Sequence, residues 1–395
     1  MPLRALGAAL VTLALAVPAA RAQRVAEPAG WAVFTRSFDA YLAQDSIVGG
    51  AVIFVREGRI VARHARGLAD RDPAVPVDSL TLFHYGSITK ILTAVAIMQL
   101  RERGRLSLDD RVTTYLPELR QVHTDVGSMD DVTIRMLLSH SAGFQDPTWP
   151  YTEGRAWEPF EPTRWEQLVA MMPYQEILFR PGSRYGYSNP AFIYLARIIE
   201  QLTGDPYQAY IYKNLWTPLG MTRSYFGATP YHLAAHRSNN FTFRRDSAAA
   251  RVVANGRDFD PGITIPNGGW NAPLGDLAIW AAFLTGATGG DSATARRFDT
   301  VLPRATLEEM WRPVVPVGGD SPESMGLSFF VRTHHGRRLV GHTGWQAGFR
   351  AFLYFDPATR TAVIGAVNTS NDADPGASEA GYAALLTQAL DLLAP

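Results

Sequence analysis

A serine and a lysine, Ser87 and Lys90, have the types and spacing of a nucleophile with its own base. They stand at the start of the apolar run 91–98, which predicts a helix beginning near Ser87. Residues three apart on a helix share a face, so the Lys90 amine would lie within reach of the Ser87 hydroxyl. A lysine that gives up its proton can activate a serine hydroxyl as a nucleophile.

The composition of the chain favours this catalytic interpretation over a structural one. In the structural interpretation, Ser87 caps the helix and Lys90 lies on the surface. However, Lys90 and Lys213 are the only lysines among 37 basic residues, so arginine supplies the other positive charges. Lysine can lose its proton and act as a base, which arginine cannot do in a protein. A lysine at position 90 therefore points to proton transfer.

A phenol and an amide, Tyr187 and Asn189, lie two positions apart in a segment that precedes a predicted helix. In an extended segment their side chains point roughly the same way. Tyr187 could then exchange a proton with the nucleophile, and Asn189 could hold a substrate carbonyl or Lys90. Alternatively, Asn189 caps the helix and Tyr187 is a half-buried aromatic residue; the segment alone leaves both interpretations open.

A third candidate segment, His342-Thr343-Gly344, ends an apolar strand. Glycine lets a substrate backbone approach a strand edge closely, and the edge offers hydrogen bonds to an extended acyl group. The backbone N–H of Trp345, paired with that of Ser87, would be suitably placed as an oxyanion donor. Taken alone, the segment favours the alternative, a turn that contains an incidental histidine.

Together, the three motifs resemble those of the penicillin-recognising serine hydrolases in order and spacing. The branch that they resemble contains class C β-lactamases, D-Ala-D-Ala carboxypeptidases, D-aminopeptidases and related esterases. The resemblance covers about residues 30–390 and includes the stretches 132–144, 181–189, 218–221 and 341–348. It implies an α/β (α+β) fold of the β-lactamase/transpeptidase type: a five-stranded antiparallel sheet flanked by helices, with an all-helical insertion and the active site between them.

The resemblance also implies a role for each matching residue. Ser87 would be the acylated nucleophile, Lys90 its base or proton relay, and Tyr187 the second group that transfers a proton. The N–H groups of Ser87 and Trp345 would form the oxyanion hole. The implied substrate-binding residues are Asn189, His342, Thr343 and Gly344. No cofactor and no metal are implied.

The histidine at position 342 bears on the substrate. β-Lactamases of this branch usually carry lysine there, whereas histidine resembles the D-peptidase and esterase members. A permanent ammonium helps to hold the carboxylate of a β-lactam, while histidine is mostly neutral at pH 7. The expected activity is therefore cleavage of amide or ester bonds in D-amino-acid peptides or small esters. The alternatives are a β-lactamase and a non-catalytic protein that binds penicillin or peptidoglycan-like peptides.

The distribution of helix-like and strand-like segments along the sequence predicts one domain over residues 23–395. β-Rich runs bounded by turn residues lie in the parts 23–105 and 300–395, where we expect the sheet. Short helical segments separated by loops fill the part 106–299, where we expect the helical region.

The N-terminus predicts a signal peptide over residues 1–22. Arg4 supplies a positive charge, residues 5–17 form a short apolar run, and Ala20-Arg21-Ala22 has the small-x-small pattern of a cleavage site. We expect a secreted or periplasmic protein with no stable membrane insertion after cleavage. An uncleaved anchor is the alternative.

The net charge and the lack of cysteine limit the kinds of molecule that the protein is expected to bind. A formal net charge of zero without a basic stripe argues against nucleic acid. The absence of cysteine excludes disulfides, thiolate metal sites and cysteine nucleophiles. We expect a small-molecule or peptide substrate.

Three weaker signals accompany the motifs. His232 and His236 have a spacing that could present two imidazoles to a metal on one helix face, but we expect surface or core roles for them. The segment 147–165 is rich in proline and tryptophan and could form a rim over a binding site or a structural loop. Arg332 and Arg350 lie near the late strands and could receive a substrate carboxylate, although solvent-facing roles are the expectation.

Overall fold

The fold is that of a computed structural model. It describes residues 26–144, 162–245, 249–319 and 321–395. The predicted signal peptide and most of the segment 147–165 lie outside these residues. Among the described residues, no helix has the length and apolar character needed to cross a membrane.

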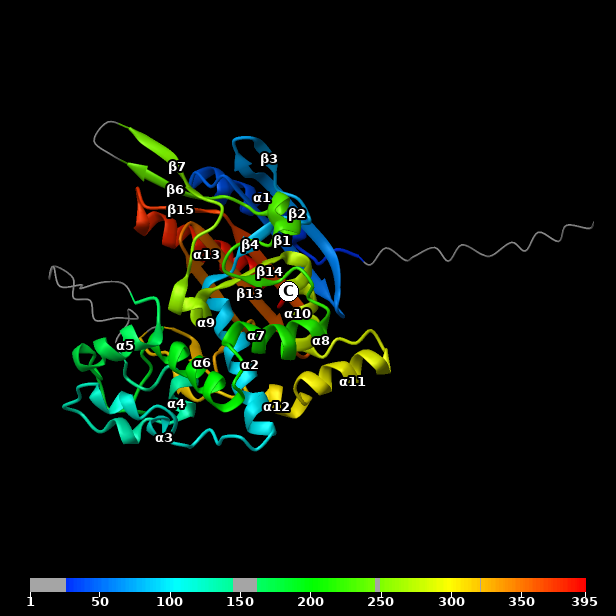
Figure 1. The fold of residues 1–395 in the computed structure, drawn as a ribbon. Coiled ribbons are helices and arrows are strands. Elements are labelled where there is room, and N and C mark those ends of the chain that lie inside the picture. The colour runs from blue at the N-terminus through cyan, green and yellow to red at the C-terminus, as the bar shows by residue number, and fades with distance from the viewer. Residues whose placement is uncertain (1–25, 145–161, 246–248, 320) are drawn as a thin grey trace, which may run out of the picture.

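The main sheet of the described chain has nine strands, and neighbouring strands are antiparallel (Figure 1). Their order across the sheet is β3-β2-β1-β14-β13-β12-β11-β10-β9. The two ends of the chain therefore meet at the centre, where β1 pairs with β14. The strands are β1 Gly49–Arg56, β2 Arg59–Arg71, β3 Ala74–Pro76, β9 Val315–Pro316, β10 Glu323–Met325, β11 Phe330–His334, β12 Arg337–Gln346, β13 Phe349–Asp356 and β14 Thr361–Val367.

The predicted fold class, an antiparallel sheet flanked by helices, is confirmed. The long strands β1, β2, β12, β13 and β14 coincide with the β-rich runs of the sequence. The sheet has more than the five strands that the resemblance implies. Strands β3, β9 and β10 are only two or three residues long, too short to show a two-residue period.

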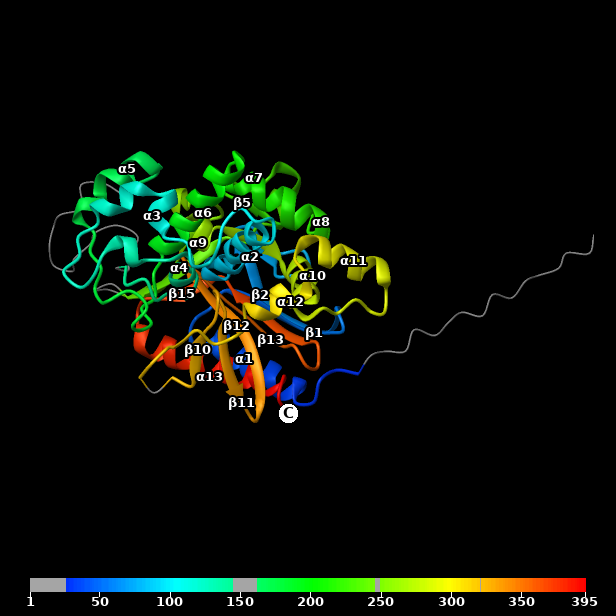
Figure 2. The same ribbon diagram turned by 90° about the horizontal axis from the view of Figure 1, so that it is seen from below.

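The helices lie on both sides of this sheet (Figure 2). The described α-helices are α1 Trp31–Gln44, α2 Thr89–Glu102, α3 Val112–Tyr115, α4 Ile134–Leu138, α5 Trp165–Met171, α6 Pro190–Thr203, α7 Tyr207–Ile211, α8 Thr217–Leu219, α9 Ile265–Gly268, α10 Leu274–Thr285, α11 Ser292–Val301, α12 Arg304–Glu309 and α13 Pro375–Asp391.

Side chains alternate across the central strands, so both faces of the sheet are buried. On β1, Val52 and Phe54 pack into an apolar cluster with residues of α1 and α13, which lie side by side. Ile53 and Val55 point to the opposite face and join the larger cluster, to which α2, α6 and α10 contribute. Figure 2 shows the helical part of the chain against this face of the sheet, and the larger cluster has members from both.

The region 106–299, expected to be all helical, also contains four short strands. They join two small three-stranded sheets, β15-β6-β7 and β4-β8-β5, each of which takes one outer strand, β15 or β4, from elsewhere in the chain. The six strands are β4 Leu82–His84, β5 Tyr225–Phe226, β6 Asn240–Arg245, β7 Ala250–Gly256, β8 Trp270–Pro273 and β15 Thr369–Asn371. Because β8 pairs with β4, the segment after α9 is held beside the residues that lead into Ser87.

Candidate active site

Ser87 lies in a one-turn 3-10 helix, η1 (Gly86–Ile88), between strand β4 and helix α2. The Thr89 hydroxyl fixes this turn: it donates to the Gly86 carbonyl at 2.7 Å and accepts the N–H of Trp270 at 3.0 Å. The side chain of Ser87 caps neither η1 nor α2. The capping interpretation of Ser87 is therefore wrong, and its hydroxyl is directed to other partners.

The Lys90 amine points at the Ser87 hydroxyl from the first turn of α2. The Lys90 side chain is buried, with no exposed surface. Its Nζ donates to Ser87 Oγ at 3.0 Å, to Asn189 Oδ1 at 2.7 Å and to the carbonyl of Asn267 at 2.9 Å. The interpretation of Lys90 as a surface residue is wrong. A buried amine held against a hydroxyl by neutral oxygens has the geometry that proton transfer requires.

Asn189 and Tyr187 come from the segment that leads into α6. Asn189 occupies the cap position of this helix but makes no capping hydrogen bond with its side chain. Its Oδ1 instead accepts from Lys90 Nζ and from Asn267 Nδ2, the latter at 3.2 Å. Of the two interpretations, contact with Lys90 is the one that the geometry matches. Lys90 Nζ also lies 4.8 Å from the centre of the Tyr187 ring.

A buried histidine, His140, supports the Tyr187 segment from below. Its ring stacks on that of Tyr187, with centroids 4.3 Å apart and planes inclined by 22°. His140 Nδ1 accepts the N–H of Ser188 at 3.0 Å, and its carbonyl accepts the N–H of Gly186 at 2.8 Å. Burial, followed by the nearby charge of Lys90, lowers the pKa of His140 well below its usual value. A neutral His140 thus carries its proton on Nε2 and fixes the phenol beside the lysine.

The strand edge that was expected to bind substrate lies directly against Ser87. A side-chain carbon at Gly344 would lie 1.9 Å from the Tyr85 carbonyl oxygen and 3.3 Å from the Ser87 nitrogen. A side-chain carbon at Gly86 would lie 2.8 Å from the nitrogen of Trp345. Glycine is therefore required at position 344. Because of this close approach, the N–H groups of Ser87 and Trp345 lie on neighbouring backbone segments. Two N–H groups that donate to the same oxyanion must be neighbours in this way.

His342 is almost completely buried on β12, and its ring packs against Phe330 with centroids 5.0 Å apart. Its Nδ1 is hydrogen-bonded to the carbonyl of Thr343, which places the ring proton on Nδ1. Burial, and then the charge of Lys90, lowers the pKa of His342 to about 3. The imidazole is therefore neutral at neutral pH, so it offers Nε2 as an acceptor and no positive charge.

The predicted residues converge on one cavity of about 430 Å³. It lies between the sheet edge, η1, the segment before α6 and the first turns of α13. The lining residues are Ser87, Tyr187, Asn189, Phe330, His342, Thr343, Gly344, Trp345, Arg350, Glu379 and Tyr382. Six of the seven residues predicted to act through their side chain or strand edge line this cavity: Ser87, Tyr187, Asn189, His342, Thr343 and Gly344. The seventh, Lys90, is buried behind the lining residues Ser87 and Asn189, which it contacts. Their catalytic and binding roles remain predictions.

The two candidate arginines occupy different environments. Arg350 lines the cavity, with its side chain only 8% exposed, and its Nη2 lies 3.3 Å from a carboxylate oxygen of Glu379. Arg332 does not line the cavity and lies 3.5 Å from Glu323 on the neighbouring strand β10. The expectation that both face solvent is therefore wrong for Arg350.

The sequence analysis missed the lining residues Phe330, Glu379 and Tyr382, and also two residues that position the catalytic candidates, His140 and Asn267. His140 lies within the stretch 132–144, but nothing in its spacing connects it with Tyr187 nearly 50 residues later. Asn267 contributes a backbone carbonyl, for which the sequence carries no signal. The pair His232 and His236 lies on a 3-10 helix, where a spacing of four does not align two side chains on one face.

Comparison with known proteins agrees with this geometry. The model of the Beta-lactamase family matches residues 34–388, and the chain belongs to this family. It is a family of serine hydrolases with the β-lactamase/transpeptidase fold, and the resemblance seen in the motifs is thereby confirmed.

Three relatives illustrate the range of the family. Esterase EstB from Burkholderia gladioli is 33% identical over 255 residues, which are 59% of this chain and 64% of the esterase, so less than two thirds of the esterase is matched. A putative D-alanyl-D-alanine carboxypeptidase from Escherichia coli K12 is 26% identical over 368 residues, covering 82% of this chain and 80% of that protein. The octameric penicillin-binding protein homologue from Pyrococcus abyssi superposes with a TM-score of 0.72 at 25% identity, covering 90% of this chain and 76% of that one.

The buried histidines predict that stability falls on acidification. Burial lowers the pKa of His84 to about 4 and that of His342 to about 3, and the pKa of His140 is also depressed. Below the unfolded value near 6.5, the unfolded chain binds protons that the folded chain excludes, so unfolding becomes more favourable as pH falls from about 6.5 toward 4. Urea unfolding midpoints at pH 7.5, 6 and 5 should decrease in that order.

The matched control is the exposed histidine at position 232. His342→Gln should flatten this pH dependence, whereas His232→Gln should leave it unchanged. Equal midpoints at pH 7.5 and 5 for the unmodified protein would show that these histidines are not held neutral.

Proposed function

We propose that the protein is an exported serine hydrolase that forms an acyl-enzyme on Ser87 and cleaves amide or ester bonds of D-amino-acid peptides or small esters. The observation that carries this proposal is the buried Lys90 amine, 3.0 Å from the Ser87 hydroxyl. A protein that only binds its ligand gains nothing from burying a base beside a hydroxyl, because burial of an amine is costly. The proposal of export rests on the signal-like residues 1–22.

The arrangement supports a two-stage reaction. Once its amine has released its extra proton, Lys90 accepts the proton of Ser87 as Oγ bonds to the carbonyl carbon, and the N–H groups of Ser87 and Trp345 stabilise the resulting oxyanion. Tyr187, in contact with Lys90, returns a proton to the departing amine or alcohol as its bond to carbon breaks. Water then attacks the acyl-enzyme, giving its proton to the same pair, and Ser87 is released with its hydroxyl restored.

The neutral imidazole of His342 supports the choice of substrate class. This uncharged, almost completely buried ring gives no charge to a β-lactam carboxylate. The similarity to an esterase and to a putative D-alanyl-D-alanine carboxypeptidase points in the same direction. β-Lactam hydrolysis is therefore the weaker candidate.

A substrate panel with covalent labelling tests the proposal. The purified protein should hydrolyse a D-Ala-D-Ala peptide, a D-amino-acid amide or a short-chain p-nitrophenyl ester faster than a cephalosporin. Reaction with a fluorophosphonate probe should increase the mass of the protein by that of one bound probe group, and peptide mapping should locate this group on Ser87. Ser87→Ala should lose both labelling and at least about 10³-fold in kcat/KM.

The control is Ser188→Ala, which removes a neighbouring hydroxyl that does not line the cavity. It should be labelled like the unmodified protein. If the unmodified protein forms no adduct and hydrolyses none of these compounds, the non-catalytic alternative is favoured. Faster turnover of the cephalosporin than of the other substrates would favour the β-lactamase alternative.

Arg350 supports recognition of an anionic group on the substrate. Its Nε and Nη1 are buried, and the buried Tyr41 hydroxyl lies beside the guanidinium, so Nη2, which pairs with Glu379, is the nitrogen left to receive a substrate anion. Its guanidinium lies 5.2 Å from the ring centre of Trp345 and 5.4 Å from that of Tyr382, which fix its plane at the cavity wall. Its one acidic partner, Glu379, has a side chain 70% exposed, so a substrate carboxylate can replace it at modest cost.

A matched pair of substrates tests this role. The protein should cleave a D-Ala-D-Ala peptide with a free terminal carboxylate about tenfold or more faster, in kcat/KM, than the same peptide with a terminal carboxamide. Arg350→Gln should abolish that preference while retaining activity on a neutral p-nitrophenyl ester. Arg332→Gln, outside the cavity, should keep the preference. Equal rates for carboxylate and carboxamide in the unmodified protein would contradict the role.

A further inference from the structure

Two histidines lie at the turn between β11 and β12, at the end of β12 remote from the cavity. His334 is the last residue of β11, and His335 with Gly336 forms the two-residue connection to β12. Both turn residues have positive φ, 47° and 75°, as a type I′ hairpin turn requires. Asn, Asp or Gly usually fills the first of these positions. This backbone geometry lets the His335 ring lie over that of His334, with centroids 4.3 Å apart and planes 19° from parallel.

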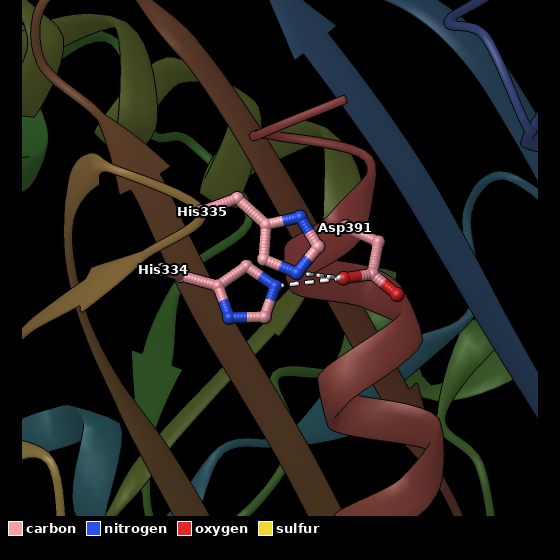
Figure 3. A group of neighbouring side chains, drawn as sticks. All are labelled: His334, His335 and Asp391. Atoms are coloured by element: carbon pink, nitrogen blue, oxygen red, sulfur yellow. Dashed lines mark hydrogen bonds and ion pairs between the residues drawn. The ribbon is translucent and has the colours of Figure 1, made fainter.

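Both imidazoles are directed at one carboxylate, that of Asp391 (Figure 3). His334 Nε2 lies 2.7 Å and His335 Nε2 3.7 Å from the same oxygen, Oδ1. One donor atom from each of the three side chains lies within 4.8 Å of the others. Within the part of the chain that the structure describes, this is the one group of three such residues with converging donor atoms.

The electrostatics of this cluster call for a cation. Asp391 is the last residue of α13, and the last turn of this helix contains no basic residue. The carbonyl end of a helix carries partial negative charge, so an added carboxylate is unfavourable there without a positive partner. A divalent metal ion would balance the carboxylate and the helix end.

We propose that His334, His335 and Asp391 bind a first-row transition-metal dication of the Zn²⁺ type. Two imidazole nitrogens and one carboxylate oxygen match the donors that Zn²⁺, Ni²⁺ and Cu²⁺ accept, whereas Ca²⁺ and Mg²⁺ prefer oxygen ligands. Three protein ligands leave one tetrahedral position for water, in keeping with side-chain exposures of 64% for His335 and 46% for Asp391.

The site can accept such an ion once the His335 ring leaves the stack. A metal lies near the plane of each imidazole that binds it, whereas the two rings stack 4.3 Å apart and 19° from parallel. The donor atoms already lie within 4.8 Å of one another, and metal–ligand bonds of roughly 2.0–2.2 Å place tetrahedral donor atoms about 3.4 Å apart. Rotation of the two exposed side chains, His335 and Asp391, supplies both the change of ring plane and the adjustment of distances.

The ion would fasten a hairpin to the C-terminal helix without taking part in catalysis. His335 precedes His342 by seven residues along the hairpin, which corresponds to roughly 20 Å or more of extended strand. A ligand at the hairpin turn thus lies far from Ser87. The expected effect of the metal is on stability, because an ion that binds only the folded chain raises its melting temperature.

Calorimetric titration of the tag-free protein with ZnCl₂ tests the site. One equivalent should bind, and excess Zn²⁺ should raise the melting temperature by a few degrees. His335→Asn keeps a residue suited to the turn but removes a ligand, and Asp391→Asn removes the charge at nearly constant shape. Each should weaken Zn²⁺ binding at least about tenfold and abolish the stabilisation. MgCl₂ at the same concentration should have neither effect.

His232→Asn is the matched control, since it removes an exposed histidine from elsewhere on the surface. It should bind Zn²⁺ like the unmodified protein. The proposal is overturned if the unmodified protein binds no Zn²⁺, or if His335→Asn and Asp391→Asn bind it as tightly as before. Because the readouts are binding and melting temperature, the outcome does not depend on the hydrolase activity.

Discussion

The burial of the Lys90 amine is the constraint on which the rest of the site depends. An amine removed from water is costly unless protein oxygens replace its hydration. Three oxygens do so here, from Ser87 in η1, from Asn189 at the start of α6 and from Asn267 in α9. Because these elements are far apart in sequence, the amine ties them to one another. Displacement of any of them would leave a buried donor without its acceptor, so the nucleophile and its base are held in a fixed relation.

The same buried environment sets the charge of the neighbouring groups. His140 and His342 lie close enough to Lys90 for its charge to lower both of their pKa values, and burial lowers them further. Two neutral imidazoles therefore flank the amine, one stacked under Tyr187 and the other on the strand edge. Positive charge at the cavity wall is supplied instead by Arg350, which lies beside Trp345 and Tyr382. In the proposed mechanism, proton transfer and recognition of an anion thus use different cationic residues of one cavity.

The parts of this arrangement that follow a local pattern could be predicted from the sequence. The three-residue spacing of Ser87 and Lys90 fixes their shared face, and continuous apolar, β-rich runs bounded by turn residues indicate the long strands such as β1 and β14. The stack of His140 on Tyr187 could not be predicted, because it depends on tertiary packing between segments with no common period. The contact of Lys90 with the Asn267 carbonyl could not be predicted either, because every residue has a backbone carbonyl and the sequence does not mark this one. Strands β3, β9 and β10 are too short to carry a pattern, and the His334–His335–Asp391 cluster joins a hairpin turn to the last residue of a distant helix.

The most direct measurement is the rate at which Ser87 becomes acylated when Lys90 is replaced by methionine. Methionine fills much of the same buried space but cannot accept a proton. With an activated p-nitrophenyl ester and intact-mass detection, Lys90→Met should acylate about 10²–10⁴-fold more slowly than the unmodified protein, at a temperature where a cooperative melting transition shows that the variant is still folded. Acylation of Lys90→Met at the rate of the unmodified protein would show that Ser87 does not depend on the amine beside it, and would contradict the role proposed for Lys90.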